Sequence, residues 1–223
     1  MPDIFDRILF IWCNPDLRAP SPPPCQVSVQ IVVSNDSSLN SRFAFASEVR
    51  TQTTLSLDDD LIVPRNIVLG LLKASRAHNL VGLDGRSFSD DGTYSFYHWM
   101  YKNKMVLTKT WVLPVAFWDL YMQDPGIINF VAAQHNCEVR FRVQTECAVY
   151  TRSNYAMTCA QDIAMNFIVR NATGEEPVMF SPGLFEKQRI DLDDTGGLSI
   201  SGDAWKWPGK RSQCVRWLMR HFE

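Results

Sequence analysis

The segment Thr53–Pro64 reads TTLSLDDDLIVP and decides the fold class. Thr53–Leu57 alternates polar and apolar side chains, which predicts a β-strand that runs directly into Asp58–Asp60. Pro64 suits the first turn of a helix, which we expect over residues 66–77. A strand and a helix joined at an acidic turn are typical of an α/β sheet, whose ligands bind beyond the carboxyl ends of its strands.

Strands and helices alternate along the remaining chain. The run of residues 7–12 (RILFIW) is nearly all apolar, as expected for a strand covered on both faces. We therefore predict an α/β fold with a mixed, mainly parallel sheet flanked by helices. The predicted strands span residues 7–12, 26–33, 53–57, 80–83, parts of 94–111 and 138–143, and the predicted helices span 39–49, 66–77, 112–121, 161–170 and the chain from 211 onward.

The composition is that of one globular domain, which we assign to residues 1–223. Of these residues 46% are hydrophobic, and the net charge of -2 gives no reason to expect a nucleic-acid partner. The chain contains no apolar run long enough to form a membrane segment, and its acidic N-terminus does not resemble a secretory signal. Six cysteines without a CxxC pair argue against a zinc ribbon and are compatible with disulfides.

The acidic cluster Asp58–Asp60 has two interpretations from local sequence. Three adjacent carboxylates repel one another, and a hard divalent cation such as Mg²⁺ or Mn²⁺ removes that repulsion while binding substrate phosphates. In extended geometry Asp58 and Asp60 point to one side and Asp59 to the other. The other interpretation is a solvated acidic turn that faces the positive end of the following helix, and local sequence alone favours it.

Asp162 and Arg211 also have ordinary structural explanations. Asp162 stands at the start of a helical pattern, where a carboxylate often caps the free backbone N–H groups. Arg211 opens a basic amphipathic segment, and an arginine there is usually a surface residue. Neither residue indicates a functional site when it is taken alone.

A set of segments in a fixed order changes that assessment, because together they resemble the exostosin-type glycosyltransferases of family 64. The resemblance extends from about Ile8 to Phe222, and its most specific elements are the triple aspartate and the later string DIAMNF. The segments are LSLDDDLIVP (Leu55–Pro64), VGL (Val81–Leu83), KMVLT (Lys104–Thr108), QDIAMNFIVRNATGEEPV (Gln161–Val178), GLS (Gly197–Ser199) and RSQC (Arg211–Cys214).

The resemblance implies a GT-A fold and a retaining transferase that uses Mn²⁺ and a UDP-sugar donor. By position, Asp60 corresponds to the metal ligand, while Asp58 and Asp59 correspond to residues beside the ribose and the metal. Asn40 and Arg42 fall where the family contacts the nucleotide.

The same resemblance gives roles to the two later residues. Asp162 corresponds to the carboxylate beside the reacting sugar, and Arg211 to the arginine facing the diphosphate. Cys159 and Cys214 resemble the disulfide that joins these two regions in the family. The resemblance also implies a glycan or glycolipid acceptor, a homo- or hetero-oligomer, and the lumen of the Golgi or endoplasmic reticulum. In that compartment the sequons Asn35–Ser37 and Asn171–Thr173 are open to glycosylation.

The chain also departs from the family pattern. It begins at what should be the second strand, without the membrane anchor usual for such enzymes, which indicates either a truncated gene product or a degenerate copy. Lys109 replaces a common glycine, and Cys159 is displaced by one residue. Residues 130–158 are unlike the family and are interpreted as an insertion or a mispredicted exon. The main alternative to a transferase is therefore a non-catalytic GT-A domain that binds sugars or partners. A metal-dependent phosphohydrolase would not explain the DIAMNF and RSQC segments.

Overall fold

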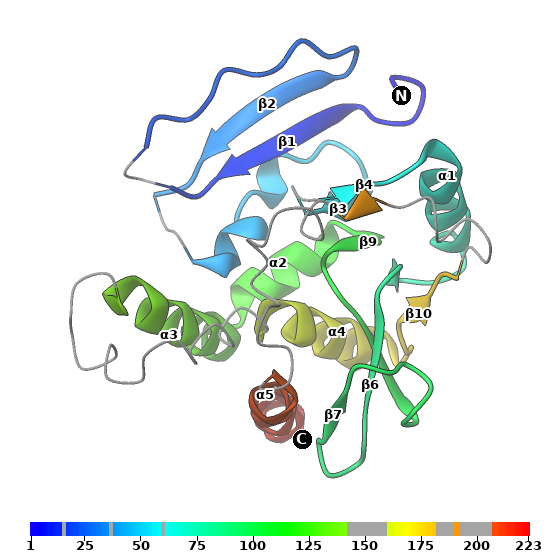
Figure 1. Cartoon of the computed structure of the whole chain (residues 1–223), viewed down its shortest axis with the longest axis vertical. Helices are drawn as coiled ribbons and strands as arrows, with labels where there is room; N and C mark the ends of the chain where they lie inside the picture. Colours follow the sequence, from blue (N-terminus) through cyan, green and yellow to red (C-terminus); the bar gives the residue numbers. More distant parts are fainter. Residues whose placement is uncertain (15–16, 36–37, 59–60, 142–159, 182–189, 192–206) are drawn as a thin grey trace.

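The structure of the protein is a computed structural model that describes residues 1–14, 17–35, 38–58, 61–141, 160–181, 190–191 and 207–223. Five α-helices and eleven short strands lie in these ranges (Figure 1). The helices are α1 (Arg65–Ala74), α2 (Ala116–Gln123), α3 (Pro125–Phe141), α4 (Ala160–Thr173) and α5 (Trp207–Phe222). The strands are β1 (Arg7–Trp12), β2 (Ser28–Val33), β3 (Thr53–Leu57), β4 (Leu61–Ile62), β5 (Val81–Gly82), β6 (Gly85–Phe88), β7 (Tyr94–Ser95), β8 (Asn103–Val106), β9 (Thr110–Pro114), β10 (Val178–Met179) and β11 (Ile190–Asp191).

The central sheet has the strand order β10-β5-β9-β3, and β9 separates two hydrophobic clusters. Side chains alternate between the faces of a strand, so Trp111 and Leu113 enter the larger cluster while Val112 enters the smaller one. The smaller cluster also contains Ile67 and Leu71 of α1. The larger cluster contains residues of α2, α4 and α5, so helices cover both faces of this sheet (Figure 1).

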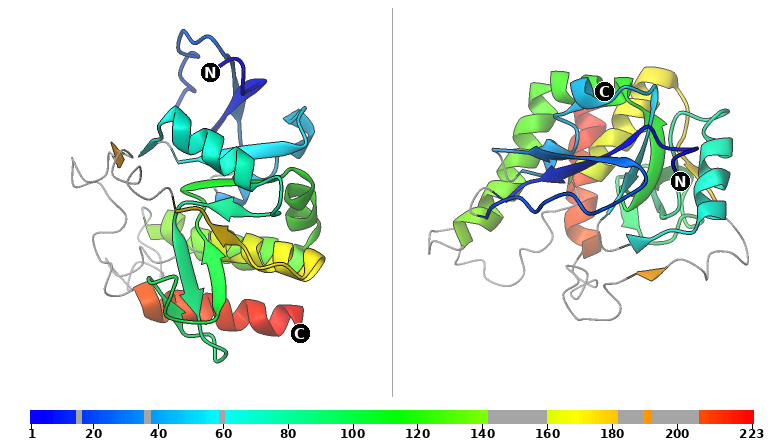
Figure 2. Two further views of the ribbon diagram at one scale, coloured as in Figure 1. Left: turned by 90° about the vertical axis from the view of Figure 1, so that its right-hand side faces the viewer. Right: turned by 90° about the horizontal axis from the view of Figure 1, so that it is seen from above.

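Helices α4 and α5 run side by side in the same direction, as Figure 2 shows. Asp162 near the start of α4 contacts Arg211 of α5, and Phe167 further along α4 stacks near Phe222 at the end of α5. The first turns of both helices therefore lie at the same end of the molecule.

A three-stranded antiparallel sheet of order β7-β6-β8, with β6 at its centre, packs beside α4 and α5. Its β6–β7 turn contains Gly92 at φ 78°, a backbone conformation that favours glycine. A Cβ atom there would also lie 2.5 Å from Cγ of Arg216, so the turn needs glycine to approach α5. This approach fixes β7 against the first half of α5.

The α/β fold with a mixed sheet flanked by helices is confirmed, but the sheets are not mainly parallel. Among the described strands, β1–β2 and β5–β10 pair in parallel, and the other five pairings are antiparallel. The reason is that β8 and β9 return along β6 and β5 as the second arm of one long hairpin, with Phe88 opposite Asn103 and Gly82 opposite Trp111, so β9 is antiparallel to β5.

Other local predictions are also corrected. Residues 39–49 form two short 3-10 turns, η1 (Leu39–Arg42) and η2 (Ala46–Glu48), instead of one helix. Residues 112–114 belong to β9, and residues 138–141 are helical within α3. Strand β1 is not covered on both faces, because Ile8 and Phe10 on one face are exposed. The predicted loop at residues 191–202 lies almost entirely outside the described residues.

Candidate functional site

Asp162 and Arg211 form a buried ion pair between the first turns of α4 and α5. Nη1 of Arg211 lies 3.3 Å from Oδ2 of Asp162, and the two side chains are only 9% and 5% exposed. The other carboxylate oxygen accepts the backbone N–H of Ile163 at 2.8 Å. The two residues that the sequence predicts to act together are 49 positions apart and do meet in space.

Tyr94 of β7 completes this cluster. Its hydroxyl accepts a hydrogen bond from Nη1 of Arg211 at 3.0 Å, and the guanidinium carbon lies 5.2 Å from the centre of the tyrosine ring. The backbone N–H of Tyr94 donates to Oγ of Ser212 at 2.9 Å, which ties β7 to α5. Tyr94 therefore sets the position of Arg211 from a strand that is 117 residues away in the sequence.

Burial governs the protonation of this cluster. It raises the pKa of the Asp162 carboxyl, while the charge of Arg211, the Ile163 N–H and the charge of Arg86 oppose the shift. Burial also raises the pKa of the Tyr94 hydroxyl, against the effect of the Arg211 charge. A carboxyl group perturbed in this way beside a fixed cation is typical of functional sites.

A second ion pair joins Asp58 at the end of β3 to Arg42 of η1. Nη2 of Arg42 donates to Oδ1 of Asp58 at 2.7 Å, and Nη1 donates to the carbonyl oxygen of Thr108 at 3.3 Å. The backbone N–H of Asp58 donates to the carbonyl oxygen of Lys109 at 3.0 Å. The structure brings Asp58 and Arg42 together, whereas Asp59 and Asp60 lie outside the described residues.

The segment from β8 to β9 connects the two ion pairs. Asn166 of α4 accepts the N–H of Val106 at 2.9 Å and donates to the carbonyl oxygens of Val106 at 2.8 Å and of Asp162 at 2.7 Å. Two residues after Val106, the carbonyl oxygen of Thr108 binds Arg42. One short stretch of chain thus anchors both Asp–Arg pairs, and both the KMVLT and DIAMNF segments take part.

Asn40 is buried and both ends of its amide are engaged within the fold. Its Oδ1 accepts the Tyr121 hydroxyl at 2.7 Å, and its Nδ2 donates to the carbonyl oxygen of Ile128 at 3.0 Å. The pKa of Tyr121 is raised, mainly by burial and additionally by the charge of Asp162. Asn40 therefore holds η1 against α2 and α3 near the Asp162 cluster, and its contact with a nucleotide stays a prediction.

The residues at the end of β3 are suited to a hard divalent cation by their chemistry. Their consecutive carboxylates supply the oxygen ligands that Mn²⁺ and Mg²⁺ prefer. In the described part of the chain, no three His, Cys, Asp or Glu side chains cluster together, and Asp59 and Asp60 lie outside that part. Asp58 contributes one carboxylate that Arg42 already orients.

The predicted disulfide has one described end. Cys214 of α5 is buried within the larger core cluster, one turn after Arg211. Cys159 lies outside the described residues, so the pairing of these two cysteines stays a prediction.

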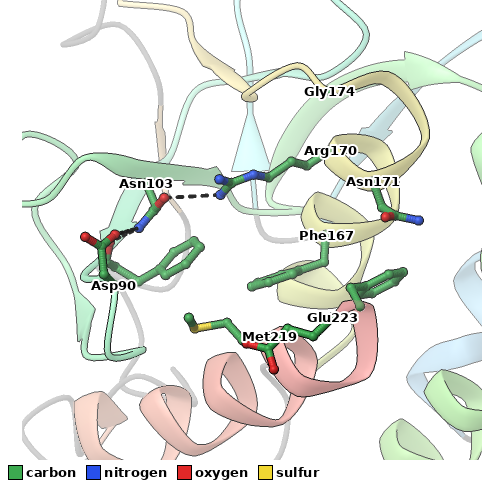
Figure 3. A pocket seen from close by; sticks show the side chains of 10 residues that line it. Asp90, Asn103, Phe167, Arg170, Asn171, Gly174, Met219 and Glu223 are labelled. Atoms are coloured by element: carbon green, nitrogen blue, oxygen red, sulfur yellow. Dashed lines mark hydrogen bonds between the residues drawn. The ribbon is translucent and has the colours of Figure 1, made fainter.

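A cavity of about 500 Å³ lies at the opposite end of α4 from Asp162 (Figure 3). Arg170 and Asn103 form part of its wall and are joined by a hydrogen bond of 3.3 Å. Met219 and Phe222 close it from the end of α5. Because it is separated from Asp162 by most of the length of α4, this cavity is distinct from the two ion pairs.

Two residues at this site were not singled out from the sequence. Tyr94 lies in the aromatic stretch predicted as strand, and Arg86 lies two residues beyond the VGLD turn on β6. The alternation of Tyr94 and Phe96 indicated a shared face of a strand, but nothing local indicated that the face would meet α5.

The fold and the site together describe an α/β domain with an acidic strand end and a buried Asp–Arg pair. The profile of the glycosyl transferase family 64 domain matches residues 3–139, and the chain belongs to that family. The predicted exostosin-type resemblance is thereby confirmed.

The chain is similar to several named transferases. It is 30% identical to glucosamine inositolphosphorylceramide transferase 1 of Arabidopsis thaliana, over 94% of this chain and 25% of the relative. It is 27% identical to exostosin-2 of Homo sapiens, over 79% of this chain and 23% of the relative. It is 25% identical to glycosylinositol phosphorylceramide mannosyl transferase 1 of Arabidopsis thaliana, over 97% of this chain and 64% of the relative. The chain thus spans about a quarter of the length of the first two.

None of the described helices combines the length and the apolar character needed to cross a bilayer.

Proposed function

We propose that this domain transfers a sugar from a UDP-sugar donor to a glycan or glycolipid acceptor, with retention of anomeric configuration and with Mn²⁺ as cofactor. The observation that carries the proposal is the buried Asp162–Arg211–Tyr94 cluster, joined through Asn166 and Thr108 to the Asp58–Arg42 pair. A buried ion pair of this kind seldom stabilises a fold, which supports a role in chemistry.

The leaving group of the proposed reaction is a nucleoside diphosphate, which gains negative charge as the bond to the sugar breaks. Arg211 stabilises that charge from a position fixed by Tyr94, so its guanidinium need not reorganise during the reaction. Arg42 orients Asp58 at the end of β3, beside the diphosphate. Asp60 would hold Mn²⁺, whose charge neutralises the departing diphosphate when the ion is bound.

Asp162 acts on the sugar side of the same reaction. Its Oδ2 faces Arg211, and its Oδ1 is held by the Ile163 N–H, so the carboxyl group is fixed in one orientation. In this setting it stabilises positive charge at the anomeric carbon or orients the acceptor hydroxyl. Arg211 keeps the ionised form accessible although burial raises the pKa.

The relatives suggest the acceptor class and the compartment. Two of them are named for inositolphosphorylceramide acceptors, and the third is an exostosin, so we propose a glycan or glycolipid acceptor and the lumen of the secretory pathway. In that compartment the exposed Asn171, at the end of α4, would be open to glycosylation. The Cys159–Cys214 disulfide and an oligomeric assembly belong to the same proposal.

Calorimetric titration with UDP, in the presence and absence of Mn²⁺, tests this function. We expect Mn²⁺-dependent UDP binding that is lost in Asp60→Ala and kept in Asp119→Ala, which removes an exposed carboxylate on α2. Absence of UDP binding under both conditions would refute the transferase function for this chain. If the protein binds UDP but neither hydrolyses a UDP-sugar nor transfers its sugar to an acceptor, the domain is a binding module and not an enzyme.

A further inference from the structure

The loop Phe96–Tyr101 (FYHWMY) between β7 and β8 is named the aromatic loop here, because it exposes a cluster of large rings. Trp99 is 69% exposed, and Tyr97 and Phe96 are 54% and 37% exposed. Exposed apolar clusters of this kind usually mark binding surfaces.

The backbone of the aromatic loop is held in place from two sides. Oγ of Ser87 donates to the carbonyl oxygen of Tyr97 at 2.5 Å and accepts the N–H of Tyr101 at 3.2 Å. Nζ of Lys104 donates to the carbonyl oxygens of His98 and Tyr101. These bonds come from β6 and β8, so the rings project from a fixed platform.

Two ring pairs lie between the exposed end of the aromatic loop and the proposed reaction site. The Tyr97 and Trp99 rings lie 5.0 Å apart between centres. Phe96, next to Tyr97, meets the Tyr94 ring edge-on at 5.6 Å. Tyr94 in turn holds Arg211, so the platform begins one ring away from the Asp162–Arg211 pair.

We infer that the aromatic loop binds the pyranose rings of the acceptor, with Trp99 as its outermost stacking surface. This inference rests on the proposed function and adds the subsite for the acceptor. A pyranose presents a face of C–H groups to an aromatic ring, whose face carries negative partial charge, while its hydroxyls lie at the edge. Tyr97, His98 and Trp99 carry polar N–H or O–H groups at their ring edges, where those hydroxyls would lie.

A lipid bilayer is the other surface to which exposed aromatic rings bind. The acceptor sugar is favoured for two reasons. Hydrogen bonds from β6 and β8 hold the loop backbone, and Phe96 contacts Tyr94, whose hydroxyl binds Arg211. The loop offers only one aliphatic side chain, Met100, for insertion into a hydrocarbon layer.

Fluorine NMR of protein labelled with 5-fluorotryptophan tests the inference at a single residue. The chain has seven tryptophans, and the Trp99 signal is the one absent from Trp99→Phe. Water-soluble glycosylinositol phosphate, without ceramide, should shift the Trp99 signal in a saturable way and leave the Trp12 signal unchanged. An unchanged Trp99 signal, or one that responds only to phosphatidylcholine vesicles, would overturn the inference, and the second result would indicate a membrane contact.

Variants at Trp99 separate stacking from simple apolar contact. Affinity for glycosylinositol phosphate should fall about 10-fold in Trp99→Leu and less than about 3-fold in Trp99→Phe, because only phenylalanine keeps an aromatic face. Leu17→Ala is the matched control, because Leu17 is 61% exposed against 69% for Trp99 and lies far from the loop. This variant should bind as the wild type does. Wild-type affinity in Trp99→Leu would contradict the inference.

UDP titration of the same variants distinguishes this inference from the proposed function. Each variant at Trp99 should bind UDP as the wild type does, because the loop lies on the acceptor side. A wild-type protein that binds glycosylinositol phosphate through Trp99 but does not bind UDP would refute the transferase and keep the sugar platform.

Discussion

The two Asp–Arg pairs of this domain contrast in burial and in geometry. Asp58 and Arg42 are 2.7 Å apart with side chains 23% and 26% exposed, whereas Asp162 and Arg211 are 3.3 Å apart and almost fully buried. Water screens the first pair and stabilises its ions separately. The second pair has lost that solvation and depends on the protein for compensation.

This difference supports different proposed roles for the two pairs. The partly exposed pair joins η1 to the end of β3 through the hydrogen bond from Arg42 to Asp58, and Arg42 also donates to the carbonyl oxygen of Thr108. These contacts fit a role for Arg42 in aligning the acidic turn. The buried pair carries a carboxyl group with a raised pKa and an arginine fixed by Tyr94.

Replacing Arg211 with methionine should lower the free energy of unfolding by about 3–5 kcal/mol, because Asp162 would be left as a buried charge without its partner. Urea unfolding at neutral pH measures the loss. The double variant Arg211→Met with Asp162→Asn should be more stable than Arg211→Met alone, since it removes the buried charge. If Asp162→Asn changes the stability of the wild type and of Arg211→Met by the same amount, the two residues are not energetically coupled.

The raised pKa of Asp162 predicts a pH dependence of stability. The folded protein keeps the Asp162 proton to a higher pH than the unfolded chain does, so stability is lost as pH rises from about 4 towards the folded pKa. Asp162→Asn cannot titrate there. The unfolding free energy of the wild type minus that of Asp162→Asn should therefore decrease with rising pH. A difference that stays flat or increases would contradict a raised pKa of Asp162 in the folded protein.

Tyr94→Phe removes the hydroxyl that accepts a hydrogen bond from Arg211 and keeps the ring beneath the guanidinium. We expect a loss of about 1 kcal/mol in unfolding free energy. Turnover of a UDP-sugar should fall as well, with little change in UDP affinity, if the hydroxyl positions Arg211 for the reaction. A variant that loses stability but keeps its full turnover would restrict Tyr94 to a structural role.

Arg42→Ala should have the smallest effect on stability, less than about 1 kcal/mol, because the pair with Asp58 is partly solvated. Thermal unfolding together with UDP calorimetry tests whether its effect on ligand binding exceeds its effect on folding. Arg50→Ala, at an exposed arginine outside the site, is the control. A loss of stability as large as that of Arg211→Met would remove the distinction between the pairs.

Much of the framework could be predicted from the sequence, because local patterns determine it. The bounds of β1 and β3 agree with the prediction, since both strands have clear apolar patterns. The starts of α4 and α5 brought Asp162 and Arg211 together as the resemblance implied. The strand predicted over residues 138–143 is wrong, because residues 138–141 belong to helix α3. Alternation over so short a segment does not distinguish a strand from a helix, and α3 is stabilised by packing against α2 and α4.

Other features depend on contacts between distant segments, which no local pattern contains. Tyr94 becomes part of the site only because Gly92 lets its hairpin approach α5 and because Ser212 accepts its N–H. The antiparallel direction of β9 follows from the return of β8 and β9 along β6 and β5, and the periodicity of β9 alone does not give it. The engagement of Asn40 with Tyr121 likewise joins residues 81 positions apart.

A crystal structure of the protein with UDP and Mn²⁺ tests the central claim most directly. The claim is that the two Asp–Arg pairs flank one donor molecule. We predict a diphosphate between them, within hydrogen-bonding distance of the Arg211 guanidinium, with the metal at the end of β3. A diphosphate bound away from both pairs, for example against Arg170 in the cavity of Figure 3, would contradict it.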